Sequence, residues 1–384
     1  MIRANGVMSA MGIVAGPYEL GDLLGAGSMG VVYKAALPDG LPVAVKLLHP
    51  QLLTDAYAVE RFRDEGVAGL IVRHPNVISV LDRGETADKI PFLVMARIGG
   101  ESLAARLHRE GPLSLRRAAM IIRQILAGLH ALHTAGVIHG DVKTDNILVA
   151  TDEGGSDTAV LVDLGLASPW FVGNDEPVPE DALISGTPEY MAPELGRGAR
   201  PAPATDIYAA GVVLYELITG SIPFSGATVV EIIGRHHSDD VTPPSFLDPD
   251  STIPPILDRI VMRALEKNPE RRFKSAAAFA AALEVALPCL DDSPAGLCTR
   301  LSRETPTLDW ERPGEARDAP RRERIAAGIS NYPRWPISID RRRPRRRGFA
   351  RRVVPATVMP PRRRSRAGGA RGGAAAAVRR RRDR

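Results

Sequence analysis

The stretch HGDVKTDN, residues 139–146, decides the fold, because it places an aspartate, a lysine and an asparagine on one short segment. Asp141 can accept the proton of an attacking hydroxyl group, and Lys143 can neutralise charge on a transferred group. Asn146 can offer an amide oxygen to Mg²⁺. His139 is expected to be a packed structural residue, because the aspartate already supplies the base. The spacing therefore predicts a phosphoryl-transfer loop.

A second carboxylate follows at the end of an apolar run. Asp163 comes after AVLV and, within LVDLG, stands two residues before a glycine. A carboxylate at the end of a strand can ligate a Mg²⁺ ion that bridges phosphate groups. One Asp-x-Gly motif is weak evidence alone, so its weight comes from its order along the chain after Asp141.

A glycine-rich stretch, GAGSMGVV at residues 25–32, fits the pattern G-x-G-x-x-G-x-V. Its glycines would let a hairpin lie close over phosphate groups, so that backbone N–H groups can meet them. A plain glycine-rich hairpin is the alternative. Strand-like residues follow the stretch, whereas a dinucleotide-binding fold needs a helix at this point. The expected nucleotide-binding positions are Gly25, Gly27, Gly30 and Val32.

Lys46 lies inside the apolar run LPVAVKLL, where burying an unpaired ammonium group is costly. It is either an edge lysine that points to solvent or a lysine that binds phosphates while paired with a carboxylate. Glu65 is the predicted partner and Glu60 the alternative. Glu65 is favoured because the nine residues from it to His74 fit a helix that ends before the next strand.

Strand-like runs dominate residues 18–98, and helical patterns follow from residue 99 onward. The runs YELGDLLGAGSMGVVYKAAL, LPVAVKLL and PFLVMARI are β-branched and broken by Gly and Pro, with VERFRDEGVAGLI as one helix beside them. Ser114 is expected to cap the helix LRRAAMIIRQILAGLHALHT, which should stop at Gly136. Further helices are predicted at GVVLYELITG, PPILDRIVMRALEKN and residues 276–287.

Charge is divided unevenly along the chain. Residues 1–287 carry 24 Lys and Arg against 35 Asp and Glu, whereas residues 288–384 carry 26 Arg and 10 acidic residues. This Arg-, Pro- and Gly-rich tail shows no periodicity and is predicted to be disordered. It has three open interpretations: a weak contact with nucleic acid or an anionic surface, a docking arm for an acidic partner, or an extension without a role.

Cysteine usage and hydropathy point to a cytoplasmic protein without a transmembrane segment. Two cysteines, Cys289 and Cys298, are too few for a disulfide framework or a cysteine metal site. Apolar runs fall short of the roughly 18–20 residues that span a bilayer. His236 and His237 are expected to be a solvated surface pair, because no partner ligands lie nearby in the sequence.

In this order the motifs resemble those of the eukaryotic-like serine/threonine protein kinases of bacteria, over about residues 18–287. The resemblance implies an α+β fold with a β-rich N-lobe (18–98) and a helical C-lobe (99–287). Residues 1–17 would be an N-terminal extension and residues 288–384 a disordered tail. ATP would bind between the lobes with Mg²⁺, or alternatively Mn²⁺, and protein Ser and Thr hydroxyls would be the substrates.

The resemblance also implies roles for individual residues. Met95 falls at the gatekeeper place, so the backbone from Ala96 to Ile98 is expected to face the adenine edge. The pair Ala96-Arg97 departs from the usual acidic–aromatic pair of the family, which puts the hinge side chains in doubt but not main-chain contacts. The remaining assignments are Lys46 and Glu65 as an ion pair, Asp141 as the base, and Asn146 and Asp163 as metal ligands.

Gly140 is the main departure, because protein kinases usually carry Arg there and small-molecule kinases of the aminoglycoside and choline phosphotransferase type often carry HGD. Features further on favour a protein kinase. They are Thr187 in GTPEYMAPE, which would contact Asp141, Asp206 in TDIYAAG, which would brace the catalytic loop, and a buried Glu194–Arg272 ion pair. An ATP-binding pseudokinase is the other alternative, although every residue required for the chemistry is present.

The missing arginine bears on regulation. In the family it binds a phosphorylated activation-loop residue through charge-assisted hydrogen bonds, which glycine cannot do. Residues 168–187 contain no threonine before Thr187 and only Ser185 near their end, and they carry four acidic residues. We therefore predict activity that does not depend on activation-loop phosphorylation.

Overall fold

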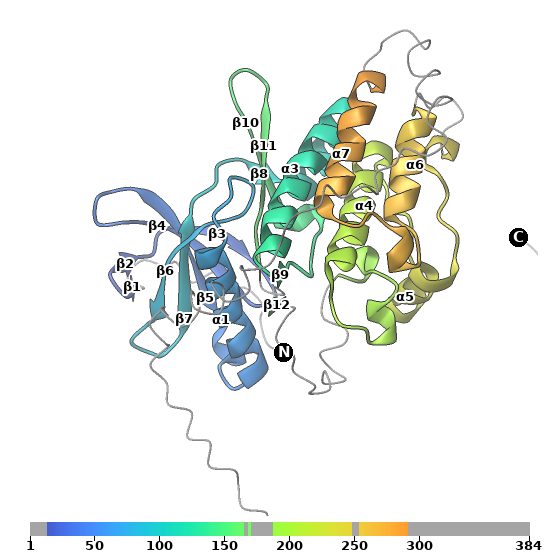
Figure 1. Ribbon diagram of the computed structural model, residues 1–384. Coiled ribbons are helices and arrows are strands. Elements are labelled where there is room, and N and C mark those ends of the chain that lie inside the picture. Colours follow the sequence, from blue (N-terminus) through green and yellow to red (C-terminus); the bar gives the residue numbers. More distant parts are fainter. Residues whose placement is uncertain (1–13, 165–167, 170–186, 248–252, 291–384) are drawn as a thin grey trace, which may run out of the picture. The chain divides into compact units, whose positions relative to one another are not determined.

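The computed structural model describes residues 14–164, 168–169, 187–247 and 253–290 (Figure 1). All of them belong to one compact unit, Met1–Ile325. The predictions for the N-terminal extension, for most of the segment 168–187 and for the arginine tail lie outside the described residues. These predictions therefore remain untested.

A five-stranded antiparallel sheet forms the first part of the chain, in the spatial order β3-β4-β5-β7-β6. The strand-like runs supply β3, β4, β5 and β7 at the predicted places. The edge strand β6 was not predicted. Its sequence VLDRGE is polar, and Val80 is its one buried residue. The bounds are Leu23–Ala26 (β3), Gly30–Ala36 (β4), Pro42–Leu48 (β5), Val80–Glu85 (β6) and Pro91–Ala96 (β7), with a small hairpin of Val14–Ala15 (β1) and Tyr18–Glu19 (β2).

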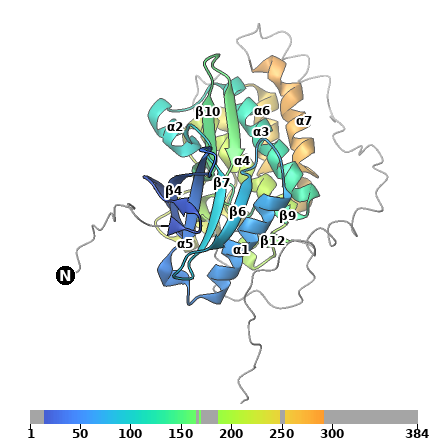
Figure 2. The ribbon, with the colours of Figure 1, turned by 90° about the vertical axis from the view of Figure 1, so that its left-hand side faces the viewer.

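One long helix, α1 (Ala56–Ile71), packs beside strands β6 and β7 (Figure 2). Asp55 caps it, because Asp55 Oδ1 accepts hydrogen bonds from the backbone N–H groups of Tyr57 and Ala58 at 3.0 and 3.1 Å. The buried face of the helix carries Phe62 and also Glu65. A carboxylate is thus placed on the sheet side of the helix.

The second part of the chain is mainly helical, as predicted (Figure 1). Helices α3 and α4 form its centre, and most of α4 is buried because the run GVVLYELI is apolar apart from Glu216. The helices are Leu103–Glu110 (α2), Leu115–Thr134 (α3), Pro203–Thr219 (α4), Val229–Ser238 (α5), Pro255–Ala264 (α6) and Ala276–Ala286 (α7). The strands are Glu101–Ser102 (β8), Val137–Ile138 (β9), Ile147–Thr151 (β10), Asp157–Leu161 (β11) and Ser168–Pro169 (β12).

Helix boundaries follow local signals with three main differences. Helix α4 begins at Pro203, eight residues before the predicted start at Gly211. Helix α3 covers the predicted residues, but Ser114 at its N-cap makes no side-chain capping hydrogen bond. Helix α6 ends at Ala264, four residues before the predicted end at Asn268. Asn268 instead accepts a hydrogen bond from Glu270 N at 3.0 Å and begins a new turn, and Pro269 disfavours a helical residue before it.

The expectation of a solvated histidine pair is wrong for His236. Its side chain is only 1% exposed, its Nδ1 lies 2.8 Å from Tyr208 Oη, and its ring meets Phe224 edge-on. His236 stands four residues after Ile232 on the buried face of α5, so helical periodicity carries it inward. His237 lies on the exposed side, 2.8 Å from a guanidinium nitrogen of Arg197.

Burial of His236 predicts an acid-sensitive fold. Burial, and then the charge of Lys267, lowers the pKa of His236 to about 4, against about 6.5 in the unfolded chain. The unfolded chain therefore binds this proton more readily, and the free energy of unfolding decreases as pH falls from 6.5 towards 4. We expect a loss of about 2 kcal/mol between pH 7.5 and 5, measured by urea unfolding.

The matched variants are His236→Asn, which removes the titrating group, and His237→Asn, which removes the exposed neighbour. Only His236→Asn should flatten the dependence of the unfolding free energy on pH. Equal pH slopes in the wild type and His236→Asn would contradict the assignment.

Candidate active site

Strand β5 and helix α1 bring Lys46 and Glu65 together in the interior. Lys46 Nζ lies 2.8 and 2.7 Å from the two carboxylate oxygens of Glu65 and 2.7 Å from Asp163 Oδ1. Burial alone would lower the pKa of Lys46, but the two carboxylates outweigh it and raise that pKa above its ordinary value. The lysine is therefore a buried cation, and its helix partner is Glu65 rather than Glu60.

Asp163 lies two residues beyond β11 with an unusual backbone. Its φ is 59°, in the left-handed region that costs a non-glycine residue about 1–2 kcal/mol. The ion pair with Lys46 offsets this cost. Burial works to raise the pKa of Asp163, but the charge of Lys46 outweighs burial and lowers it. An ionised carboxylate is thus held next to the lysine.

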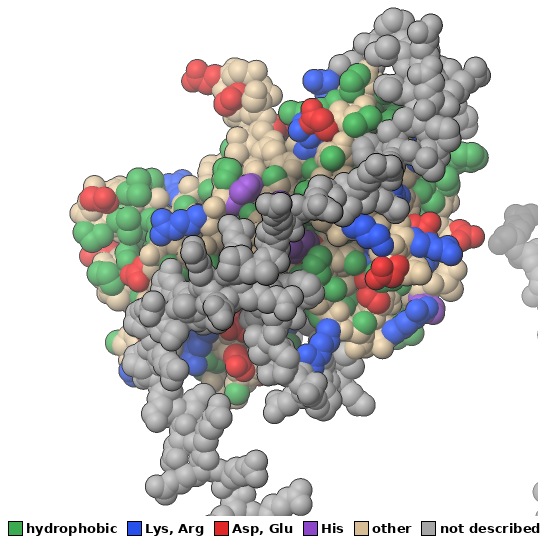
Figure 3. Space-filling view, in the orientation of Figure 1, with side chains coloured by type: hydrophobic (Ala, Val, Ile, Leu, Met, Phe, Trp, Pro, Cys, Tyr) green, Lys and Arg blue, Asp and Glu red, His purple; other side chains and the backbone are tan. Residues whose placement is uncertain are grey.

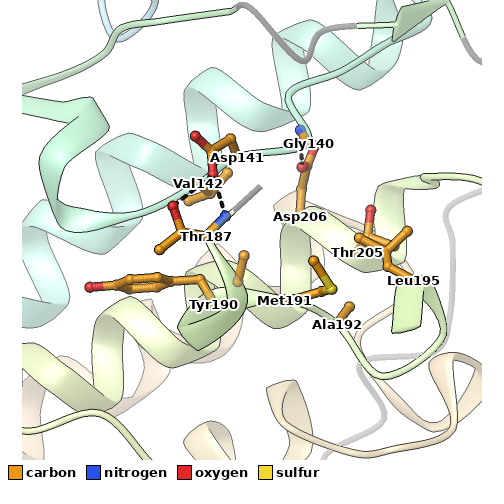
Figure 4. A pocket seen from close by; sticks show the side chains of 11 residues that line it. Gly140, Asp141, Val142, Thr187, Tyr190, Met191, Ala192, Leu195, Thr205 and Asp206 are labelled. Atoms are coloured by element: carbon orange, nitrogen blue, oxygen red, sulfur yellow. Dashed lines mark hydrogen bonds between the residues drawn. The ribbon is translucent and has the colours of Figure 1, made fainter. Parts of the chain in front are cut away.

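Asp206 in α4 anchors the segment that carries Asp141 (Figure 4). Its carboxylate accepts hydrogen bonds from His139 N at 2.9 Å, Gly140 N at 2.8 Å and His133 Nε2 at 2.7 Å. Burial works to raise the pKa of Asp206, but the hydrogen bond and charge of His133 lower it. The catalytic loop is therefore attached to the core through its backbone, without a side chain at Gly140.

The backbone at Gly140 suits glycine in its own right. Its φ is 79°, a conformation that L side chains adopt only with strain. His139, by contrast, is completely buried, as expected for a structural residue.

Three side chains converge on the carboxylate of Asp141. Its Oδ2 accepts hydrogen bonds from Lys143 Nζ at 2.8 Å and Asn146 Nδ2 at 3.0 Å. Its Oδ1 lies 3.3 Å from both the backbone nitrogen and the hydroxyl of Thr187 (Figure 4). Lys143 Nζ also donates to Thr187 Oγ1 at 2.6 Å. The structure thus brings Asp141 and Lys143 into contact with Thr187.

A backbone hydrogen bond joins the cluster of Lys46, Glu65 and Asp163 to the cluster around Asp141. Val162 N, next to Asp163, donates to Asn146 O at 2.9 Å. This hydrogen bond places the two predicted metal ligands, Asn146 and Asp163, on adjoining segments.

The glycines of the loop between β3 and β4 serve different purposes. A Cβ atom on Gly30 would lie 2.1 Å from Leu47 O, so glycine is required there by the close approach of β5. A Cβ atom on Gly25 would meet no described atom within 4 Å, and one on Gly27 would lie 4.0 Å from Gly30 O, so both positions have room. Val32 pairs with Lys46 across β4 and β5. His49, which sequence reasoning did not single out, lies with its Nε2 2.9 Å from Gly27 O and holds the loop.

Met95 occupies the end of β7, between β5 and β6. It is buried and pairs with Ala44 on one side and Val80 on the other. Ala96 N donates to Ser79 O at 2.9 Å, and Ile98 packs against the core. Contact of the backbone from Ala96 to Ile98 with adenine remains a prediction.

Arg272 and Glu194 form a bidentate ion pair away from Asp141. Both guanidinium–carboxylate distances are 2.7 Å, and Arg272 is 0% exposed. The same guanidinium donates to the carbonyl oxygens of Ala204, Glu266 and Lys267. This pair ties the segment after residue 187 to the helical core.

Sequence reasoning missed Thr144, Tyr190 and Glu216, which form a hydrogen-bonded chain beside the site. Thr144 and Tyr190 belong to the two motifs that were recognised, but neither has a charge or a metal-binding group to draw attention. Glu216 looks like an ordinary helical residue in the sequence. Only their proximity in space reveals them.

Comparison with known proteins agrees with this geometry. The family described as "Protein kinase domain" matches residues 18–283, so the chain belongs to the protein kinase family. It is 39% identical over 273 residues to "Serine/threonine-protein kinase pkn3" of Myxococcus xanthus, which covers 71% of this chain and 50% of that protein.

It is also 36% identical to "Serine/threonine-protein kinase PknB" of Mycolicibacterium smegmatis, over 68% of this chain and 41% of that protein. The match to "Serine/threonine-protein kinase PknD" of Mycobacterium tuberculosis (strain H37Rv) is 39% identical, over 71% and 40%. The predicted membership among bacterial eukaryotic-like serine/threonine protein kinases is confirmed. The chain spans half or less of the length of these relatives. Among the described residues, every helix is too short or too polar to cross a membrane.

Proposed function

We propose that this chain transfers the γ-phosphate of ATP to Ser and Thr hydroxyls of proteins. The observation that carries the proposal is the convergence of Lys143, Asn146 and Thr187 on the carboxylate of Asp141. In the proposed mechanism Asp141 accepts the hydroxyl proton as the hydroxyl attacks the γ-phosphorus, and the bond to the β–γ bridging oxygen breaks to release ADP. Lys143 neutralises charge on the transferred group.

Lys46 is proposed to bind the α- and β-phosphates while Glu65 keeps it oriented. The buried lysine already has carboxylate partners at 2.7–2.8 Å, so its position does not depend on the nucleotide. Gly25 and Gly27 leave room for phosphate groups to approach the backbone of the loop. The backbone from Ala96 to Ile98 is proposed to bind the adenine edge.

Kinases of this family use ATP with a divalent metal, and we propose Mg²⁺, with Mn²⁺ as the alternative. The carboxylate of Asp163 and the amide oxygen of Asn146 are hard donors that fit either ion. Within the described part of the chain, His, Cys, Asp and Glu form no cluster of three that could hold a metal. When bound, the ion would neutralise charge on the phosphate groups.

Two alternatives make different predictions. A pseudokinase would bind ATP without transferring phosphate, and a small-molecule kinase would phosphorylate an aminoglycoside or choline but not a protein. Two contacts favour a protein substrate, because each involves a residue of the GTPEYMAPE region that protein kinases share. Thr187 contacts Asp141, and Glu194 pairs with Arg272.

A cytoplasmic location is part of the proposal, supported by the use of ATP and by the low cysteine content. A weak contact of the arginine tail with nucleic acid or an anionic surface is a separate proposal that rests on the tail's charge alone. On the face shown in Figure 3, the described basic and acidic side chains are interspersed, so that face adds nothing to it.

The test is a transfer assay with purified protein, ATP, Mg²⁺ and a generic basic protein substrate. We expect phosphate on Ser or Thr of the substrate and no transfer after chelation of the metal. If the protein bound ATP but transferred phosphate to no acceptor, it would be a pseudokinase. If it transferred phosphate only to small molecules, it would be a small-molecule kinase.

Independence from activation-loop phosphorylation gives a separate prediction. Gly140 contributes a backbone N–H to Asp206 and has no side chain that could bind a phosphate. The double variant Ser168→Ala/Ser185→Ala should therefore keep its kcat/KM within about twofold of wild type. Loss of most of the activity in the double variant, measured in the same assay with neither protein treated with phosphatase, would refute the independence.

A further inference from the structure

A chain of three polar side chains joins the catalytic loop to helix α4. Thr144 Oγ1 lies 3.0 Å from Tyr190 Oη, and Tyr190 Oη lies 2.6 Å from Glu216 Oε2. Thr144 is 1% exposed, and Tyr190 is also buried. Buried polar groups are costly unless they are hydrogen bonded, so the three groups depend on one another.

The direction of the hydrogen bonds is fixed by the number of protons. Burial raises the pKa of Tyr190, so its phenol stays protonated, and its single proton is donated to Glu216. The phenol oxygen can then only accept from Thr144, whose hydroxyl is the donor. A side chain without a hydroxyl at position 144 would leave this acceptor unpaired.

Tyr190 ends a short turn, and the beginning of this turn is also attached to the loop that carries Asp141. Residues Pro188–Tyr190 form one turn of 3₁₀ helix, closed by Tyr190 N donating to Thr187 O at 3.0 Å. Thr187 is held by Lys143 and Tyr190 by Thr144. Lys143 and Thr144, which are consecutive in the chain, therefore hold the two ends of a turn whose first residue, Thr187, contacts Asp141.

We propose that Thr144 is a positioning residue for the protein substrate: its hydroxyl fixes the turn 187–190 relative to Asp141. The inference rests on the proposed function, because the turn lies where the hydroxyl to be phosphorylated must approach the base. The hydroxyl acts through Tyr190 and touches neither ATP nor the reacting atoms. Its loss should therefore affect use of the protein substrate and leave the affinity for ATP unchanged.

The competing role is that of a buried threonine that only fills space. Thr144→Val keeps the shape and removes the hydroxyl, whereas Thr144→Ser keeps the hydroxyl and removes a methyl group. Thr86→Val is the matched control, because Thr86 is a buried threonine whose Oγ1 accepts from Ile90 N at 3.1 Å in the turn between β6 and β7. Tyr190→Phe removes the middle hydroxyl of the chain and provides a second route to the same effect.

Steady-state kinetics should show kcat/KM for the protein substrate about tenfold lower in Thr144→Val, with KM for ATP unchanged. Thr144→Ser should keep most of the wild-type value, and Thr86→Val should keep it fully. Adding Thr144→Val to Tyr190→Phe should cost little more than either change alone, because both break one chain.

Hydrogen exchange of the peptide that contains residues 187–195 tests the attachment without any need for catalysis. Exchange should be faster in Thr144→Val and Tyr190→Phe than in the wild type and Thr86→Val. Unchanged exchange would overturn the inference, even if the protein were inactive and the proposed function had failed. Faster exchange with unchanged kcat/KM, or equal kinetic losses in Thr144→Val and Thr144→Ser, would also overturn it.

Discussion

Replacing Asp141 by Asn is expected to lower the rate of phosphate transfer to a protein substrate about a thousandfold while ATP still binds. Asparagine has nearly the same shape, but its amide cannot accept the hydroxyl proton. The neighbours of the aspartate carboxylate, Lys143, Asn146 and Thr187, are hydrogen-bond donors to it, so none of them replaces it as the proton acceptor. The decrease should appear in kcat, because the lost interaction is made in the transition state.

Asp145→Asn is the matched control for this change. Asp145 lies on the same loop but is exposed, and it should keep its activity within about twofold. Thermal unfolding of both variants would show whether the fold is intact. If the Asp141→Asn variant retained more than about a tenth of the wild-type activity, Asp141 would be excluded as the base.

Much of the site could be predicted because it depends on order along the chain. Lys46 stands out as a lysine in an apolar strand, and the cost of burying it alone demands a carboxylate. The length of the helix then selects Glu65 over Glu60, and the structure shows that pairing. Such inferences need only local periodicity and one energetic rule.

The rest depends on contacts between distant segments. Thr144, Tyr190 and Glu216 are separated by up to 72 residues and carry no signal of their own. The burial of His236 was missed because the pair of histidines was judged by the lack of partner ligands nearby in the sequence, and not by the place of His236 four residues after Ile232. Tertiary packing decides whether such polar residues face solvent, and local pattern alone does not supply it.

The largest expected effect on stability comes from the Glu194–Arg272 pair. Arg272→Met should lower the free energy of unfolding by about 3–5 kcal/mol, because removing one partner leaves a charge without compensation. Three carbonyl oxygens, those of Ala204, Glu266 and Lys267, would lose their donor as well. Arg271→Met is the matched control, since Arg271 is the exposed neighbour and should change stability by less than about 0.5 kcal/mol.

The double variant Glu194→Met/Arg272→Met separates the cost of the unpaired charge from the loss of the pair itself. A buried ion pair gains little over apolar side chains of similar size, so removing both charges should recover part of the stability lost in Arg272→Met. Chemical denaturation at pH 7 measures all three variants. If Arg272→Met cost no more than Arg271→Met, the pair would not hold the segment after residue 187 to the core. If the double variant were less stable than Arg272→Met, the pair's own attraction, and not an uncompensated carboxylate, would account for the loss.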